Sequence, residues 1–171
     1  MRAYDRDGRL VSVASYRGAD LASRETRVWK EGVLVKVVLE AGTRKTTTEY
    51  AADGAAAGKL LVLTVESDGA VVSTERRFYD GSGRLAGTET AARGRTTLVE
   101  HVYDDRGVLS STRTSTGGAV VSVVIHESPS VRVEELYDSG EVFARVRYED
   151  GRRVLEEIIH AGVVVRTRRF D

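Results

Sequence analysis

The chain has 171 residues, and its 26 Lys and Arg side chains are balanced by 26 Asp and Glu, so the formal net charge is zero. This balance removes the broad electrostatic attraction on which nucleic-acid binders and membrane-surface proteins depend. The absence of cysteine excludes disulfides and thiolate metal sites. No stretch approaches the roughly 18 to 20 apolar residues of a membrane-spanning helix. We therefore expect neither a nucleic-acid partner nor a membrane span.

Short polar turns built around glycine recur along the whole chain. Asp-Gly and similar pairs supply the positive φ angles that two-residue hairpin turns require. In chain order the turns are expected at Gly8, Gly18, Gly32, Gly42, Gly54, Gly69, Gly83, Gly94, Gly107, Gly118, Pro129, Gly140, Gly151 and Gly162. The spacing predicts strand, tight turn, strand, repeated from end to end.

The segments between these turns are rich in β-forming residues, as in 33–39 and 96–103. No window shows a helical period. The alanine-rich stretch 51–61 is interrupted by Gly54 and Gly58, so we predict a longer turn there. The fold class is therefore all-β, an antiparallel meander of about 14 to 16 short strands joined by tight glycine turns. We expect a single β-repeat domain over residues 1–171.

Three segments share the pattern Tyr-Asp-x-x-Gly: YDRDGRL at 4–10, YDGSGRL at 79–85 and YDDRGVL at 103–109. In this pattern the Asp carboxylate can accept hydrogen bonds from backbone N–H groups of the turn, and the glycine supplies the left-handed residue. The tyrosine is expected to end a strand and to pack its ring on a neighbour. The motif's chemistry is thus mostly turn chemistry.

The motif resembles that of the YD-repeat (RHS-like) family, in which Tyr-Asp-x-x-Gly-Arg-Leu recurs along the chain. The MORN-like bacterial repeat proteins are a second, weaker likeness. The first resemblance implies a segment of a cell-surface, periplasmic or secreted protein. In that family such arrays build shells around toxin domains or form extended adhesive surfaces. The sequence alone leaves the compartment open.

Charges alternate in sign from strand to strand in the last third of the chain. Pairing through tight turns at 139–140 and 150–151 places Glu134 opposite Arg145, and Arg145 opposite Glu156, as a cross-strand ladder. Glu134 and Glu135 are neighbours on one strand and so point to opposite faces. An extended or spiral sheet, wetted on both faces, fits this pattern best. The alternative is a closed β-barrel or groove lined by the apolar segments 33–39, 60–65 and 120–125.

The last residues, Arg169-Phe170-Asp171, look like the start of another Tyr-Asp unit. Repeat arrays normally need capping units, and open sheet edges invite pairing. We therefore expect a fragment of a longer array, or a subunit whose sheet edges associate with a second copy or with a protein partner.

Candidate catalytic chemistry is sparse. His101, His126 and His160 lie far apart in the sequence, without the short spacing of metal ligands. Glu134 and Glu135 point apart, which is the wrong arrangement for acid–base work at one site. We expect no catalytic, cofactor-binding or metal-binding residues, and no cofactor.

The sequence favours a non-catalytic β-repeat scaffold or protein-interaction module over an enzyme. A ligand- or partner-binding β-barrel or groove protein is the alternative. An elongated sheet without a deep pocket would favour the scaffold, and a concave apolar cavity would favour the binder.

Overall fold

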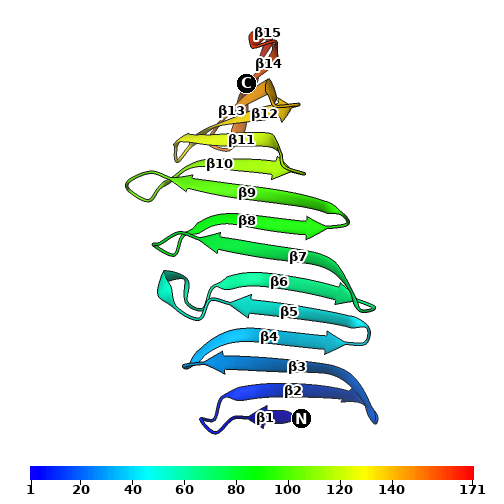
Figure 1. The fold of residues 1–171 in the computed structure, drawn as a ribbon. Helices are drawn as coiled ribbons and strands as arrows, with labels where there is room; N and C mark the ends of the chain where they lie inside the picture. Colours follow the sequence, from blue (N-terminus) through cyan, green and yellow to red (C-terminus); the bar gives the residue numbers. More distant parts are fainter. The chain divides into compact units, whose positions relative to one another are not determined.

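The computed structural model describes residues 1–171 and contains fifteen β-strands and one short 3-10 turn (Figure 1). The elements are β1 (Arg2–Tyr4), β2 (Leu10–Arg17), β3 (Asp20–Lys30), β4 (Val33–Ala41), β5 (Arg44–Tyr50), η1 (Gly54–Ala56), β6 (Leu60–Ser67), β7 (Ala70–Tyr79), β8 (Leu85–Ala92), β9 (Arg95–Tyr103), β10 (Leu109–Thr116), β11 (Ala119–Ser128), β12 (Val131–Asp138), β13 (Glu141–Glu149), β14 (Arg152–His160) and β15 (Val163–Arg169). The predicted all-β antiparallel meander is confirmed. No helix of the protein has the length and apolar character to cross a membrane.

The strands fall into two compact units, Met1–Gly94 with β1 to β8 and Arg95–Asp171 with β9 to β15. In each unit the order of strands in the sheet is their order in the chain, and every neighbouring pair is antiparallel. In neither unit does the first strand pair with the last, so neither sheet closes. The closed-barrel alternative is therefore wrong, because each strand finds its partners in the adjacent hairpin arms.

Tight two-residue turns join many of the strands, as their sequences predict. At the turn between β12 and β13, Ser139 has a φ of 50° and Gly140 a φ of 86°. Both central residues of such a turn adopt positive φ, which matches the right-handed twist of the flanking strands. Pro129 also lies in a turn, between β11 and β12, as predicted.

A β-bulge accompanies almost every hairpin. Within the two units only the β4–β5 pair runs without a register shift. After six of the tight turns the extra residue lies three positions beyond the turn glycine, at Val35, Val72, Val121, Phe143, Val154 and Val165. After the turn at Gly18 it is Ala22, four positions beyond the glycine. Each bulge places two residues opposite one and increases the local twist.

The buried core is small and divided between the two faces of the sheets. Among the hydrophobic side chains only Ala51, Val133, Ala144 and Val146 are largely shielded from solvent, with exposed fractions of 7%, 8%, 3% and 5%. Val133 pairs with Arg147, whereas Val146 pairs with Glu134, so Val133 and Val146 lie on opposite faces. The second unit is thus a single sheet with polar and apolar side chains on both sides.

The segment after β5 is a longer turn, as predicted, with η1 at its centre. Ala51 N donates to Lys59 O at 2.9 Å and Gly58 N donates to Ala51 O at 2.8 Å, which closes the loop on itself. The loop packs against the turn after β7, where a Cβ on Gly83 would lie 2.2 Å from the Ala55 carbonyl oxygen. Glycine at this position therefore allows both the positive φ and the close approach.

Candidate functional site

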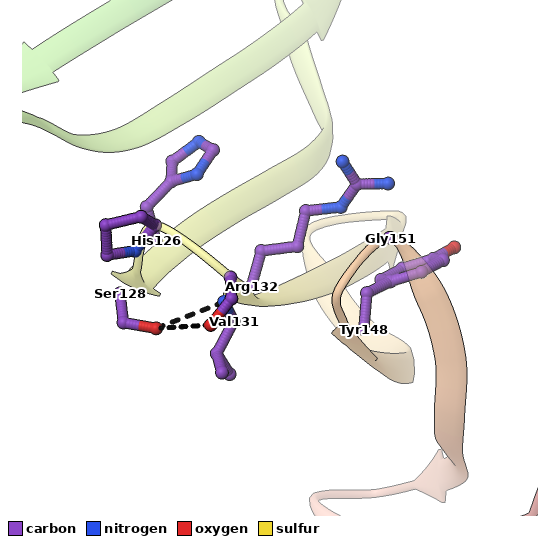
Figure 2. A pocket seen from close by; sticks show the side chains of 8 residues that line it. His126, Ser128, Val131, Arg132, Tyr148 and Gly151 are labelled. Atoms are coloured by element: carbon purple, nitrogen blue, oxygen red, sulfur yellow. Dashed lines mark hydrogen bonds between the residues drawn. The ribbon is translucent and has the colours of Figure 1, made fainter.

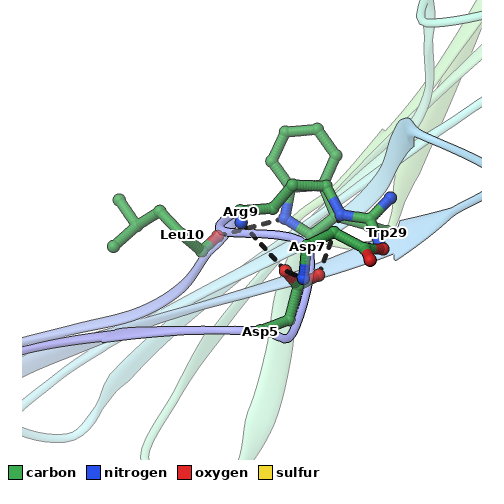
Figure 3. Close-up of polar contacts among 5 residues, drawn as sticks. All are labelled: Asp5, Asp7, Arg9, Leu10 and Trp29. Atoms are coloured by element: carbon green, nitrogen blue, oxygen red, sulfur yellow. Dashed lines mark hydrogen bonds and ion pairs between the residues drawn. The ribbon is translucent and has the colours of Figure 1, made fainter.

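The turn of the first Tyr-Asp-x-x-Gly copy is closed by the side chain of Asp5 (Figure 3). Its Oδ1 accepts hydrogen bonds from the backbone N–H groups of Asp7 and Arg9, both at 2.9 Å, and its Oδ2 accepts one from Arg9 Nε at 2.8 Å. The backbone adds Asp5 N to Arg9 O at 2.9 Å. The carboxylate thereby replaces the partners that this short loop cannot find in the sheet.

The other two copies repeat the arrangement. Asp80 Oδ1 accepts from the N–H groups of Ser82 and Arg84 at 2.9 Å, and Arg84 Nε donates to Asp80 Oδ2 at 2.7 Å. In the third copy Val108 stands where the others have arginine, so Asp104 keeps its two backbone donors and takes its ion pair from Arg106 at 3.5 Å. We call these three loops the Asp-stapled turns.

The hydrogen bonds of the Asp-stapled turns favour the ionised carboxylate. The backbone N–H of Arg9 is the largest cause that lowers the pKa of Asp5, and that of Arg84 does the same for Asp80. The backbone N–H of Val108 lowers the pKa of Asp104 in the same way. These pKa values are lowered by the hydrogen bonds of the turns themselves, and the carboxylates do not lie in a cleft. The lowered pKa values therefore indicate a structural role.

Aromatic residues lie at or beside the ends of most odd-numbered strands, and two of them bond to the backbone beside an adjacent turn. Trp29 Nε1 donates to Leu10 O at 3.0 Å, so the indole lies against the first Asp-stapled turn (Figure 3). Tyr79 donates in the same way to Leu60 O at 2.9 Å, also nineteen residues back along the chain. The predicted packing role holds for Tyr79. It is wrong for Tyr4, whose ring is exposed at the end of β1.

The end of β11 departs from this pattern and borders a pocket (Figure 2). Ser128 stands where other odd-numbered strands have an aromatic residue, and its Oγ accepts a hydrogen bond from Val131 N at 3.1 Å. The pocket has a volume of about 260 Å³, and His126, Arg132 and Tyr148 contribute its largest polar side chains.

The predicted ladder of opposite charges exists, but with different partners. Arg145 pairs across the sheet with Glu135 and Glu157, at 2.8 Å and 3.5 Å, and not with Glu134 and Glu156. The prediction assumed uninterrupted pairing from each turn, whereas the bulges at Phe143 and Val154 shift the register by one residue.

The histidines are separate from one another, and no group of three or more His, Asp or Glu side chains comes together. His101 on β9 lies 3.3 Å from Thr112 Oγ1, His126 lines the pocket, and His160 ends β14. The sequence analysis named His126 only as an isolated histidine and Pro129 only as a turn residue, and it predicted no pocket where they meet. The sequence feature that marks this pocket is a break in the repeat, because Ser128-Pro129 stands where other copies have an aromatic residue.

Comparisons with known proteins identify no family. No family model and no curated protein matches the chain. A solved structure of S. aureus TarM, a mutant in complex with fondaparinux, alpha-GlcNAc-glycerol and UDP, is similar over 67% of this chain and 19% of its own, with 11% identity and a TM-score of 0.28. A second TarM structure has 12% identity, the same coverage and the same TM-score.

The structure of TcdB2-TccC3-Cdc42 is similar over 92% of this chain and 13% of that chain, with 11% identity and a TM-score of 0.23. The chain thus spans about a fifth or less of the length of each of these structures. At such scores none of the three carries an argument about function.

Proposed function

We propose that this chain is a non-catalytic β-repeat module that acts as a scaffold or a protein-interaction surface. The observation that carries the proposal is the repeated hairpin whose two faces both expose side chains. A sheet of this kind holds its shape through strand pairing and turns, so its faces remain open to a partner. The polar sites found in it, the Asp-stapled turns, serve the fold itself.

Exposed apolar side chains support an interaction role. Val102, Ile125 and Phe143, which lie in strands of the second unit, have exposed fractions of 54%, 40% and 43%. A partner that covered these side chains would remove apolar surface from water, which favours association.

The outermost strands offer a second kind of contact. β1 pairs only with β2, β15 pairs only with β14, and every residue of both outer strands is exposed. An open edge presents backbone N–H and C=O groups that can accept another strand. Association of copies, or addition of a partner's strand, at these edges would extend the sheet through the same backbone pairing that joins its own strands.

The family assignment is part of the same proposal. Three Tyr-Asp-x-x-Gly copies share one pattern of backbone hydrogen bonds, which is what a turn-forming repeat motif requires. A YD-repeat-like module would place the chain on a cell surface, in a periplasm or among secreted proteins, as one segment of a larger array.

Sedimentation velocity over a concentration series, combined with amide hydrogen exchange on the same samples, tests the proposal. We expect the mass to rise with concentration while amides of β1 and β15 become protected, because added strands pair with them. A chain that stays monomeric, with edge amides that exchange equally fast at every concentration, would show that the edges do not associate.

A further inference from the structure

A row of cationic and aromatic side chains crosses β11 to β15 on one face of the second unit. His126 pairs in register with Arg132, Arg132 with Tyr148, and Tyr148 with Arg153. Phe170 continues the row beyond β15, where its backbone N donates to Val154 O at 3.1 Å. We call these residues, together with Arg168, the Arg-aromatic row. Its first part borders the pocket at the end of β11 (Figure 2).

The rings of the row hold its guanidinium groups. The Cζ atom of Arg132 lies 4.5 Å from the centroid of the Tyr148 ring, while those of Arg153 and Arg168 lie 4.5 Å and 4.7 Å from the Phe170 centroid. Such cation–π contacts restrict a long flexible side chain and leave the N–H edge of the guanidinium facing outward. The row is therefore a set of preorganised donors.

Two of these guanidiniums have no carboxylate partner within the chain. Arg153 pairs with Glu156, whereas Arg132 and Arg168 form no salt bridge. On the opposite face the situation is reversed, since Arg145 contacts two carboxylates. Guanidinium groups that are held in place without an anion are the feature expected of a surface that receives its anions from a partner.

The spacing of the row suits one form of acidic chain. Arg132 and Arg153 stand two strands apart, which is roughly 9.5 Å at the usual strand spacing. A polyproline II segment returns to the same side every third residue, after about 9.3 Å. We propose that the Arg-aromatic row binds an acidic, extended segment of a partner protein with Asp or Glu at every third position. One carboxylate would lie at Arg132 and the next at the two guanidiniums over the Phe170 ring, where Arg168 has no salt bridge of its own and lies beside Arg153.

The contacts of the row disfavour single-stranded nucleic acid. Base stacking needs open aromatic faces, and here guanidinium groups stand over the rings of Tyr148 and Phe170. Glu134 and Glu156 also lie on this face, beside Tyr148 and Arg153 respectively, and would repel a dense row of phosphates. A peptide with one carboxylate in every three residues carries only one charge per roughly 9.3 Å and is repelled less.

This inference rests on the proposed function, because it names the partner of an interaction module. The two can fail separately, because they are tested by different measurements. Strand addition at β1 and β15 tests the proposed function, and peptide binding to a face tests the row. The direct test is fluorescence anisotropy of a labelled peptide of Glu-Pro-Pro repeats, titrated with the full chain at low ionic strength. A Gln-Pro-Pro peptide of equal length is the matched ligand.

We expect the acidic peptide to bind and the neutral peptide not to bind. Arg132→Gln and Arg168→Gln should each weaken binding by about tenfold, the effect of losing one charge-assisted contact. Arg152→Gln is the matched control, because Arg152 precedes Arg153 and points to the opposite face. It should bind as the unchanged chain does, and circular dichroism should show all three variants folded.

Variants of Tyr148 separate the ring's positioning role from charge. Tyr148→Phe keeps the ring under Arg132 and should retain binding, whereas Tyr148→Leu keeps apolar bulk but removes the cation–π contact and should weaken it. Equal binding of both peptides, or an Arg132→Gln variant that binds normally, would overturn the proposal. Tighter binding of a sulfated oligosaccharide or of oligothymidine than of the acidic peptide would overturn it as well.

Discussion

At the scale of single residues, the Asp-stapled turns show how one side chain can organise a loop. Asp5, Asp80 and Asp104 each accept two backbone hydrogen bonds, from the N–H groups two and four residues further along the chain. The aspartate of the Tyr-Asp-x-x-Gly pattern was predicted to do this from the sequence. The role of the following arginine was not, and Arg9 and Arg84 complete the staple by pairing with the same carboxylate.

These carboxylates predict a pH dependence of stability. Their pKa values in the folded state are lowered, chiefly by backbone N–H donors, from about 3.9 in the unfolded chain. A lowered pKa contributes stability that is present above the unfolded value and is lost as the pH falls through the folded value. We expect the urea midpoint to drop as the pH falls below about 4, and more weakly in a variant with Asp5→Asn, Asp80→Asn and Asp104→Asn.

Asn keeps an oxygen acceptor for the turn but has no charge to titrate. The matched control is Asp20→Asn, because exposed Asp20 staples no turn. An unchanged pH profile in the triple variant would contradict the assignment of the acid transition to the staples.

Two glycines at the same motif position separate backbone strain from close packing. Gly8 and Gly83 have φ values of 79° and 78°, but only Gly83 lies against the loop at Ala55. Gly8→Ala should lower the free energy of unfolding by about 1 kcal/mol, the cost of the left-handed conformation. Gly83→Ala should cost about 1 to 3 kcal/mol more, because the added methyl group meets a backbone carbonyl. Urea denaturation gives both values, and equal losses would refute the contact.

At the scale of the element, the hairpin with its bulge is the unit of construction. The number, direction and order of the strands could be predicted from the sequence, because glycine turns and β-forming runs are local signals. Register could not, because a bulge depends on side-chain packing across the hairpin. The signal that the prediction overlooked is a Val or Phe three residues after the turn glycine, as at Val72 and Phe143.

The Arg-aromatic row could not be predicted for the same reason. Its members come from five consecutive strand ends, and the bulges decide which residues align. With uninterrupted pairing, Arg145 would join Glu134, and the whole face would carry a different set of neighbours. A shift of one residue exchanges the two faces of a strand, so functional surfaces on such sheets follow the bulges.

A double-mutant cycle checks the observed register. Arg145→Ala combined with Glu135→Ala should show a coupling of about 0.5 to 1 kcal/mol, the value for a partly exposed ion pair. Arg145→Ala combined with Glu134→Ala should show none, because Glu134 lies on the opposite face, near the Tyr148 hydroxyl. Free energies of unfolding from urea titrations give the four corners of each cycle. A coupling to Glu134 that exceeds the coupling to Glu135 would contradict the bulge at Phe143.

At the scale of the molecule, each unit relies on contacts between neighbouring strands. Strands contact the strands directly before and after them, and few residues are buried. A repeat protein of this kind distributes its stability over successive interfaces. Because stability comes from strand pairing and not from a covered core, both faces stay available to a partner. This is the physical basis of the proposed interaction role.

The exposure of both faces is therefore the central claim, and the absence of native cysteine makes it directly measurable. Single cysteines placed at Glu134 and Glu135 in the second unit, and at Thr47 and Thr48 in the first, report on opposite faces of one strand. The measurement is the rate of thiol labelling of each folded variant. We predict rates within about tenfold for the two members of each pair, because neither face must open first. If one member of a pair were slower by more than about a hundredfold, labelling would require local unfolding, and a covered face would contradict this account.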